Sequence, residues 1–372
     1  MPEATHRLLR VTLVVLLLVL AVVVMRLTLV VSLPVVLACF ILMLTQPLQQ
    51  GLQSRGLHQG LANALTLLTV ALVAAVFVLL LTWLGQIVVA QAPDYGPQLD
   101  RLLAHWHQRL TDWGGAEVVA PQGVNLQAVI DYLVGWVPGV FRGIYGFMGL
   151  VVLTATFLVL GMIESRDLPE RVREALRPAT AQVLLKATTE WAHKLRRYVL
   201  ARTAVSALTG VAVWGFTWAI GLDMPMVWGL LTFLLNFIPM LGSMVAVVPP
   251  VLVAFMQPQA WMGISALIGL TSIQLLIGNY LDPRLEGRIL CLSPFVLFLS
   301  VIFWGWVWGI PGALIGIPLT TGIVVFCRHG ESTRWLAQLL EHHTDDEPAE
   351  PARDEVAPTE VAPTAHSPVE PR

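Results

Sequence analysis

One long apolar run constrains this chain more than any other feature. It extends from Met226 to Met256 and is interrupted in its middle by Asn236-Phe237-Ile238-Pro239. A continuous helix of this length would measure roughly 45 Å, whereas the hydrocarbon core of a bilayer is about 30 Å thick. Pro239 lacks a backbone donor and disfavours helix before it, and Gly242 permits a turn. The sequence predicts a hairpin here, or a kinked spanning helix, with a further stop at Pro249-Pro250.

The composition places this run inside a membrane protein. The chain is 56% hydrophobic and only 12% charged, a balance that excludes a water-soluble domain of this length. Unpaired backbone groups cost several kcal/mol each in hydrocarbon, so a broken helix at membrane depth must be buried in protein or line a wet cavity. The predicted fold is therefore an all-α polytopic membrane protein with broken or re-entrant helices.

Motifs for catalysis are missing from the sequence. Cys39, Cys291 and Cys327 all lie in apolar stretches and have no metal-ligand spacing, and neither an HExxH nor a Walker pattern occurs. No catalytic residue, metal site or cofactor is expected, and the chain is not expected to be an enzyme. Nucleic acid is not an expected partner either.

The order of apolar and polar stretches predicts six regions. These are spans one to three at 1–90, an extracytoplasmic helical segment at 91–139, span four at 140–163, cytoplasmic amphipathic helices at 164–202, a core with two broken hairpins at 203–327, and a disordered, acidic, Pro-rich cytoplasmic tail at 328–372.

The basic residues predict the orientation. With the N-terminus in the cytoplasm, 18 of the 22 Lys and Arg residues lie inside, in agreement with the positive-inside rule. If 226–256 is a hairpin that enters and leaves from outside, Arg284 and Arg288 also lie inside; if the run crosses fully, they lie outside. The count favours the hairpin and places both termini in the cytoplasm.

A second broken segment follows the sixth predicted span, Trp261 to Leu281. Two short apolar arms, Pro294 to Trp308 and Ala313 to Phe326, are joined by Gly309-Ile310-Pro311-Gly312. If both broken segments are hairpins from opposite faces, the chain contains an inverted-topology repeat, which transporters use to form one midplane site. Two ordinary short spans at 294–326 would give the same sidedness, so both interpretations stay open.

Several motifs together resemble the AI-2E family of bacterial transporters over nearly the whole chain. The first is the Asn-x-Ile-Pro-x-x-Gly block from Asn236 to Gly242, followed by the Pro-Pro pair. The later ones are Gln274, Asp282-Pro283-Arg284 with Gly287, Leu292-Ser293-Pro294, the Gly pair at 309 and 312, and Gly316 with Pro318.

This resemblance implies a multi-pass bacterial inner-membrane protein of about eight transmembrane segments, surrounded by membrane lipids and assembled as a homo-oligomer. It also implies transport of a small polar solute or an ion. Family members are associated with export of autoinducer-2, a quorum-sensing signal, and others with sodium-proton exchange. The resemblance therefore leaves the substrate open.

The leading hypothesis is a secondary transporter that works by alternating access. Asn236, Gln274 and Asn279 would supply neutral hydrogen bonds to the solute, and exposed backbone groups near Pro239, Gly242, Pro311 and Gly312 would supply partial charges. Asp282 and Arg284 would lie at the membrane edge of the pathway. Alternatively, Asn236 and Asn279 only cap helix breaks.

Two other functions remain possible from the sequence. A sodium (lithium)-proton antiporter needs an ionisable group inside the membrane, and between Arg202 and Asp282 the only acidic residue is Asp223. A non-transporting membrane scaffold would be organised by the acidic tail. The aromatic run Trp304 to Trp308 would either stack on a sugar-like ligand or form an interfacial or oligomer-facing belt.

Overall fold

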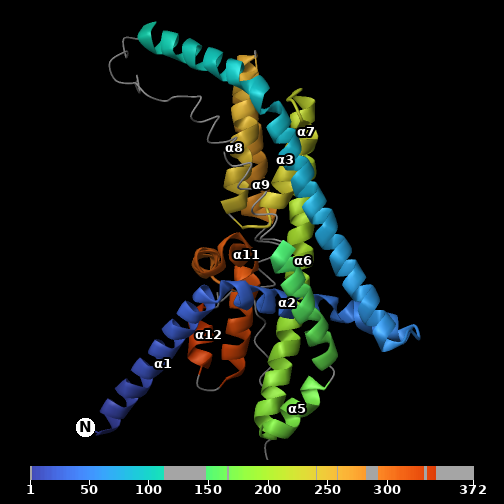
Figure 1. Ribbon diagram of the computed structural model, residues 1–372. Coiled ribbons are helices and arrows are strands. Elements are labelled where there is room, and N and C mark those ends of the chain that lie inside the picture. The colour runs from blue at the N-terminus through green and yellow to red at the C-terminus, as the bar shows by residue number, and fades with distance from the viewer. Residues whose placement is uncertain are drawn as a thin grey trace, which may run out of the picture.

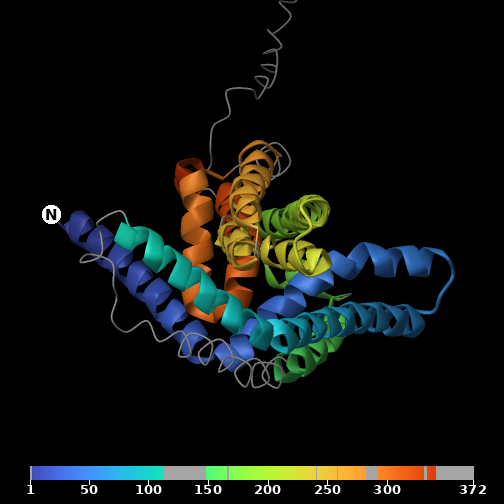
Figure 2. The same cartoon turned by 90° about the horizontal axis from the view of Figure 1, so that it is seen from above.

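Figure 1 shows the computed structural model, which describes residues 2–112, 148–165, 167–239, 241–257, 259–281, 292–330 and 333–340. Every regular element in these ranges is a helix, which confirms the predicted all-α fold. Seen from above, helices α6 to α9 and α11 form a bundle, and the blue helices α1 to α3 lie along one side of it (Figure 2).

Fewer full-length spans are present than the resemblance implies. Among the described residues, four helical segments are long and apolar enough to cross a membrane, or five if a bent pair formed by Met148–Glu164 and Leu168–Ala175 counts as one span. Four further apolar helical segments are shorter, at 10–17 residues. The expectation of about eight transmembrane segments is therefore not confirmed in the described part of the chain.

The N-terminal helices are long and expose apolar side chains. Helix α1 covers Pro2–Leu27, α2 covers Leu29–Ser54, and α3 covers Gln59–Asp112. Helix α3 continues past residue 90, where the sequence predicted the end of span three. Leucine and valine side chains on α1 and α3 are widely exposed, as expected of helices in contact with lipid.

Helix α6, Pro178–Ala219, is the central element. It is preceded by the short helix α5, Leu168–Ala175. The sequence placed the change from an amphipathic segment to span five at residue 202, and the 42 residues on both sides of it form one helix about 63 Å long. A change from interfacial to apolar surroundings does not interrupt backbone hydrogen bonding, so the composition changes where the helix does not.

The run from Met226 to Met256 forms a helical hairpin. Helix α7, Pro225–Leu235, and helix α8, Leu241–Met256, pack with the start of one beside the end of the other: Val227 and Trp228 share a buried cluster with Val253 and Ala254. The predicted stop at Pro249-Pro250 is wrong, because α8 continues through both residues. Proline removes a backbone donor and usually kinks a helix, yet neighbouring helices make it tolerable in apolar surroundings.

Helix α9, Ala260–Leu276, packs against α8 and α6 through two glycines. A Cβ at Gly263 would meet the ring of Phe255, and one at Gly269 would meet the ring of Phe216. The helix continues as a π-helical turn, η1, Ile277–Leu281. The π-helix occurs often at functional sites.

Helix α11, Pro294–His329, also forms a hairpin. Gly309 has φ 68° and ψ −148°, a non-helical conformation that glycine adopts readily. The arms on either side fold together: the hydroxyls of Ser300 and Thr320 lie 2.7 Å apart, and the indole of Trp304 donates to Thr320 at 3.1 Å. Pro311, inside the predicted connection, lies at the start of the second arm.

The folded part extends beyond residue 327, where the sequence predicted the start of a disordered tail. Helix α12, Arg334–Leu340, packs beside the start of α11, because Ala337 is buried and the backbone N–H of Ser293 donates to the carbonyl of Leu340. The prediction is wrong for residues 328–330 and 333–340. The rest of the predicted tail, 341–372, lies outside the described residues.

Candidate functional site

Polar contacts from α6 hold the break between α7 and α8. Asn236 ends α7 and is only 3% exposed. The buried guanidinium of Arg202 donates to the backbone carbonyl of Asn236, and the side-chain amide of Asn236 donates to the hydroxyl of Ser206 at 3.3 Å. Arg202 and Ser206 are four residues apart and therefore share one face of α6. The backbone carbonyl and the side-chain amide of Asn236 therefore both find partners on α6.

The turn after Asn236 is tight enough to require glycine. The backbone N–H of Gly242 donates to Ile238 at 2.9 Å, and that of Ile238 donates to Leu235 at 3.0 Å. A Cβ at Gly242 would lie only 1.7 Å from the carbonyl oxygen of Leu235. Pro239 lies between them and is half-buried. The three motif residues Asn236, Pro239 and Gly242 therefore belong to one compact structure.

The tip of α11 uses a comparable close approach. A Cβ at Gly312 would lie 2.0 Å from the carbonyl oxygen of Trp304 on the other arm. Pro311 beside it is half-buried. Each hairpin thus brings a glycine against a backbone carbonyl of its partner arm, and neither turn leaves room for a side chain at that position.

The tryptophans of this hairpin pack against the N-terminal helices of the same chain. Trp304 and Trp308 are buried, stack with ring centroids 5.0 Å apart, and share a cluster with Leu33 of α2. The indole of Trp308 donates to the hydroxyl of Ser32 at 3.1 Å. Only Trp306 is well exposed, and the guanidinium of Arg26 lies 3.9 Å from its ring centre. Trp304 and Trp308 therefore offer no open platform for a sugar.

The two hairpins approach α6 from opposite ends. The open end of the α7–α8 hairpin packs near Val213 and Leu222, and its tip lies lower on α6, at Arg202 and Ser206. The end of α11 lies at Glu190, which pairs with Arg328 and lies 3.6 Å from His329. From there α11 ascends beside Trp191, whose indole donates to the carbonyl of Pro318 at 2.9 Å.

The structure gives fewer contacts for the other predicted pathway residues. Gln274 lies on α9, half-buried, and its amide nitrogen has no hydrogen-bond partner among the described residues. Asn279 lies in η1. Asp282 and Arg284 fall outside the described residues. The structure brings Asn236, Pro239 and Gly242 together in one turn, and Pro311 and Gly312 together in another.

A sequence model described as AI-2E family transporter matches residues 11–332. This chain belongs to the AI-2E transporter family. The chain is 28% identical over 317 residues to the AI-2 transport protein TqsA of Escherichia coli K12, covering 82% of this chain and 88% of that protein. It is 32% identical over 207 residues to a putative transport protein of Borreliella burgdorferi, covering 55% and 56% of the two chains. It is 25% identical over 304 residues to the putative transport protein YhhT of Escherichia coli K12, covering 82% and 86%.

Membership confirms the resemblance and the general activity. The AI-2E chain is a multi-pass membrane transporter, and its relatives carry the names of transport proteins and not of enzymes.

Sequence reasoning missed the partners of the break in this AI-2E transporter. Arg202 is the last residue of the predicted amphipathic region, and the sequence assigned it no partner. Its spacing to Ser206, at the junction with an apolar run, was the available signal. The acidic partner of the α11 end was missed as well: Glu190 lies 3.4 Å from Lys194 and also pairs with Arg328. Charged residues so far apart in sequence can be paired only when the fold is known.

Proposed function

We propose that this AI-2E transporter is a secondary transporter of the bacterial inner membrane that exports or exchanges a small polar solute by alternating access. The observation that carries the proposal is the approach of two glycine-tipped hairpins to α6 from opposite ends. If the two hairpins form an inverted repeat, one unit can move against the other around a fixed site. In this proposal both termini are cytoplasmic and the chain works as a homo-oligomer in lipid.

The solute site would lie beside the break at Asn236. A buried amide without a partner costs about 1–3 kcal/mol, and the amide nitrogen of Gln274 is such a group among the described residues. A hydroxylated solute would satisfy it. We include the backbone near Pro239, Gly242, Pro311 and Gly312 in the pathway. Asn279, Asp282 and Arg284 are included because they follow Gln274 along the chain.

An autoinducer-2-like solute is the substrate we propose. The relative TqsA, of which this chain covers 88%, is named an AI-2 transport protein. Asn236 and Gln274 are neutral and offer both donors and acceptors, which suits a polyhydroxylated uncharged molecule.

Replacing Asn236 with alanine is expected to lower autoinducer-2 flux at least tenfold in liposomes that contain the purified transporter. The substitution removes the amide that faces Ser206 and costs about 0.5–1.5 kcal/mol of stability, so assembly should persist. Thr203→Ala is the matched control, because Thr203 is exposed on α6, the helix that carries Ser206, and its hydroxyl donates to the carbonyl of Val199 within that helix. Wild-type flux in Asn236→Ala would refute the site. Sodium-dependent proton flux without autoinducer-2 flux would favour antiport instead.

Cysteines at the two tips are expected to react from opposite sides of the membrane. Leu241 and Ile310 are both exposed and lie beside the glycines that tolerate no side chain. In a chain whose native cysteines are replaced by serine, Leu241→Cys should react faster with a membrane-impermeant maleimide from the cytoplasmic side, and Ile310→Cys from outside. Reaction of both tips from the same side would contradict the inverted arrangement.

A further inference from the structure

A pocket lined by carboxamides lies where α2 ends and α3 begins. Its volume is about 260 Å³. Six of its eight lining residues are amides, and the other two are Met162 and Ser165, at the end of the helix Met148–Glu164 and just after it. The amides are Gln46, Gln49, Gln50, Gln53, Gln59 and Asn63. We call this set the amide pocket.

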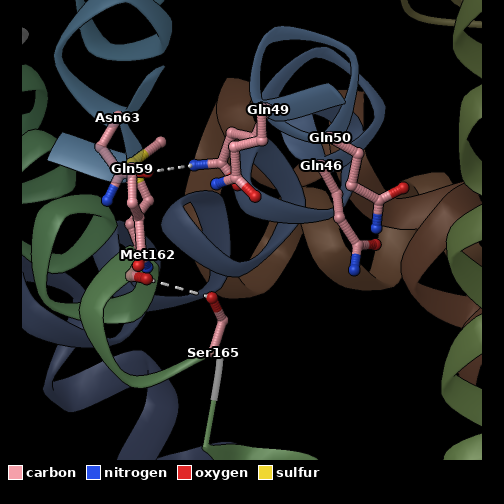
Figure 3. A pocket seen from close by; sticks show the side chains of 8 residues that line it. Gln46, Gln49, Gln50, Gln59, Asn63, Met162 and Ser165 are labelled. Atoms are coloured by element: carbon pink, nitrogen blue, oxygen red, sulfur yellow. Dashed lines mark hydrogen bonds between the residues drawn. The ribbon is translucent and has the colours of Figure 1, made fainter. Parts of the chain in front are cut away.

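The amides converge on the pocket from two helices. Gln46, Gln49 and Gln53 recur along α2 at intervals of three and four residues, which places them on one face of the helix. Gln59 and Asn63 repeat the four-residue interval at the start of α3. Figure 3 shows Gln49, Asn63 and Gln59 gathered at one end of the pocket and Gln46 and Gln50 at the other.

Hydrogen bonds fix three of these side chains. The amide of Gln49, which is buried, donates to the side-chain oxygen of Asn63 at 3.4 Å. The guanidinium of Arg196 on α6 donates to the side-chain oxygen of Gln46 at 3.3 Å and to the carbonyl of Met43 at 3.0 Å. These bonds hold the carboxamides in place at the inner wall and at the rim. The pocket is therefore built by the fold and is not a loose surface patch.

The chemistry of the lining selects a class of ligand. Each carboxamide offers two donors and two acceptors, so the set can bond to several hydroxyl groups at once. None of the eight lining residues is acidic or basic, and the guanidinium of Arg196 at the rim already donates to Gln46 and to the carbonyl of Met43. The lining therefore favours a neutral ligand over an ion. The thioether of Met162 offers an apolar surface for carbon atoms. We propose that the amide pocket binds a small, neutral, polyhydroxylated solute.

This site is separate from the break at Asn236. The pocket is lined by α2, α3 and the Met148–Glu164 region, whereas the break is built from α6, α7 and α8. The two share only a neighbour: Arg196 and Arg202 both lie on α6, about 9 Å apart along its axis. A solute molecule bound in the amide pocket therefore lies outside the site proposed at the break.

Saturation-transfer difference NMR on the full-length transporter in lipid nanodiscs tests the proposal, with ribose as the neutral polyol and ribonate as an anion of similar size. We expect ribose to bind with a Kd of roughly 1 mM, and ribonate to bind at least tenfold more weakly. No ribose signal above that of empty nanodiscs would overturn the proposal, and so would equal binding of ribonate.

The double variant Gln49→Leu with Asn63→Leu removes both partners of one bond and leaves neither unpaired. It is expected to weaken ribose binding about tenfold or more, the loss of one to two hydrogen bonds. Gln182→Leu, an exposed glutamine on α6 outside the pocket, is the matched control and should bind like the wild type. If the double variant unfolds, Gln50→Leu at the exposed rim should still weaken binding about threefold. Unchanged ribose binding in both pocket variants would overturn the proposal.

Asn236→Ala separates this site from the transport site. If the amide pocket is the ribose site, ribose binding persists in Asn236→Ala whatever happens to autoinducer-2 flux. Loss of ribose binding in that variant, with retention in the pocket variants, would assign the binding to the break and overturn the pocket. Failure of the flux prediction alone leaves the binding result unaffected.

Discussion

Gly242→Ala is expected to abolish transport and to destabilise the folded transporter by more than about 3 kcal/mol. The added Cβ would lie 1.7 Å from the carbonyl oxygen of Leu235, a backbone atom that cannot rotate away as a flexible side chain does. The turn must open to relieve this contact. Opening it would displace Asn236 from Arg202 and Ser206, which would leave buried polar groups unsatisfied. The measurements are autoinducer-2 flux in liposomes and the thermal midpoint of the detergent-solubilised protein.

A matched substitution tests whether this effect comes from the turn. Gly215 lies within α6, and a Cβ there would meet nothing within 4 Å. Gly215→Ala adds the same methyl group and should leave flux unchanged, with stability equal or higher by about 0.5–1 kcal/mol because alanine favours helix. Wild-type flux and thermal midpoint in Gly242→Ala would show that the turn is wider than the structure describes.

Local sequence favoured a hairpin at 226–256 and marked the break at 309–312, because the causes of both breaks are local. Proline at 239 and glycines at 242, 309 and 312 restrict the backbone regardless of what packs around them. Length contributed at the first break, since the run from Met226 to Met256 is too long for one straight span of ordinary thickness. These residues carried both the fold prediction and the family resemblance.

The wrong prediction at Pro249-Pro250 has a different cause, which is packing. The boundaries at 90 and 202 followed changes of composition and stay predictions about the surroundings of the chain; helices α3 and α6 are continuous through both. The stop at Pro249-Pro250 followed intrinsic propensity, which tertiary context overrides. The spacing of Gln46, Gln49 and Gln53 places these residues of the amide pocket on one helical face. Their convergence with the amides of α3 depends on how the two helices meet, which the spacing does not give.

Arg202→Met is expected to lower autoinducer-2 flux at least a hundredfold in reconstituted liposomes. The break at Asn236 depends on a residue 34 positions away, and that residue is a buried cation. A charged hydrogen bond contributes about 1.5–3 kcal/mol, and its removal leaves the carbonyl of Asn236 without this donor. Methionine preserves much of the side-chain volume, so the loss arises mainly from the hydrogen bond and the charge, and the thermal midpoint should fall as well.

Two further arginine variants separate the contribution of the planar guanidinium from that of the positive charge. Arg202→Lys keeps the positive charge but presents a single ammonium group in place of the planar guanidinium, so we expect partial flux, between those of the wild type and Arg202→Met. Arg197→Met removes an exposed arginine from the same helix and should transport like the wild type. If Arg202→Met matched Arg197→Met in flux and in thermal midpoint, the break would hold its shape without α6. That result would contradict the proposal that transport depends on the two hairpins meeting α6 from opposite ends.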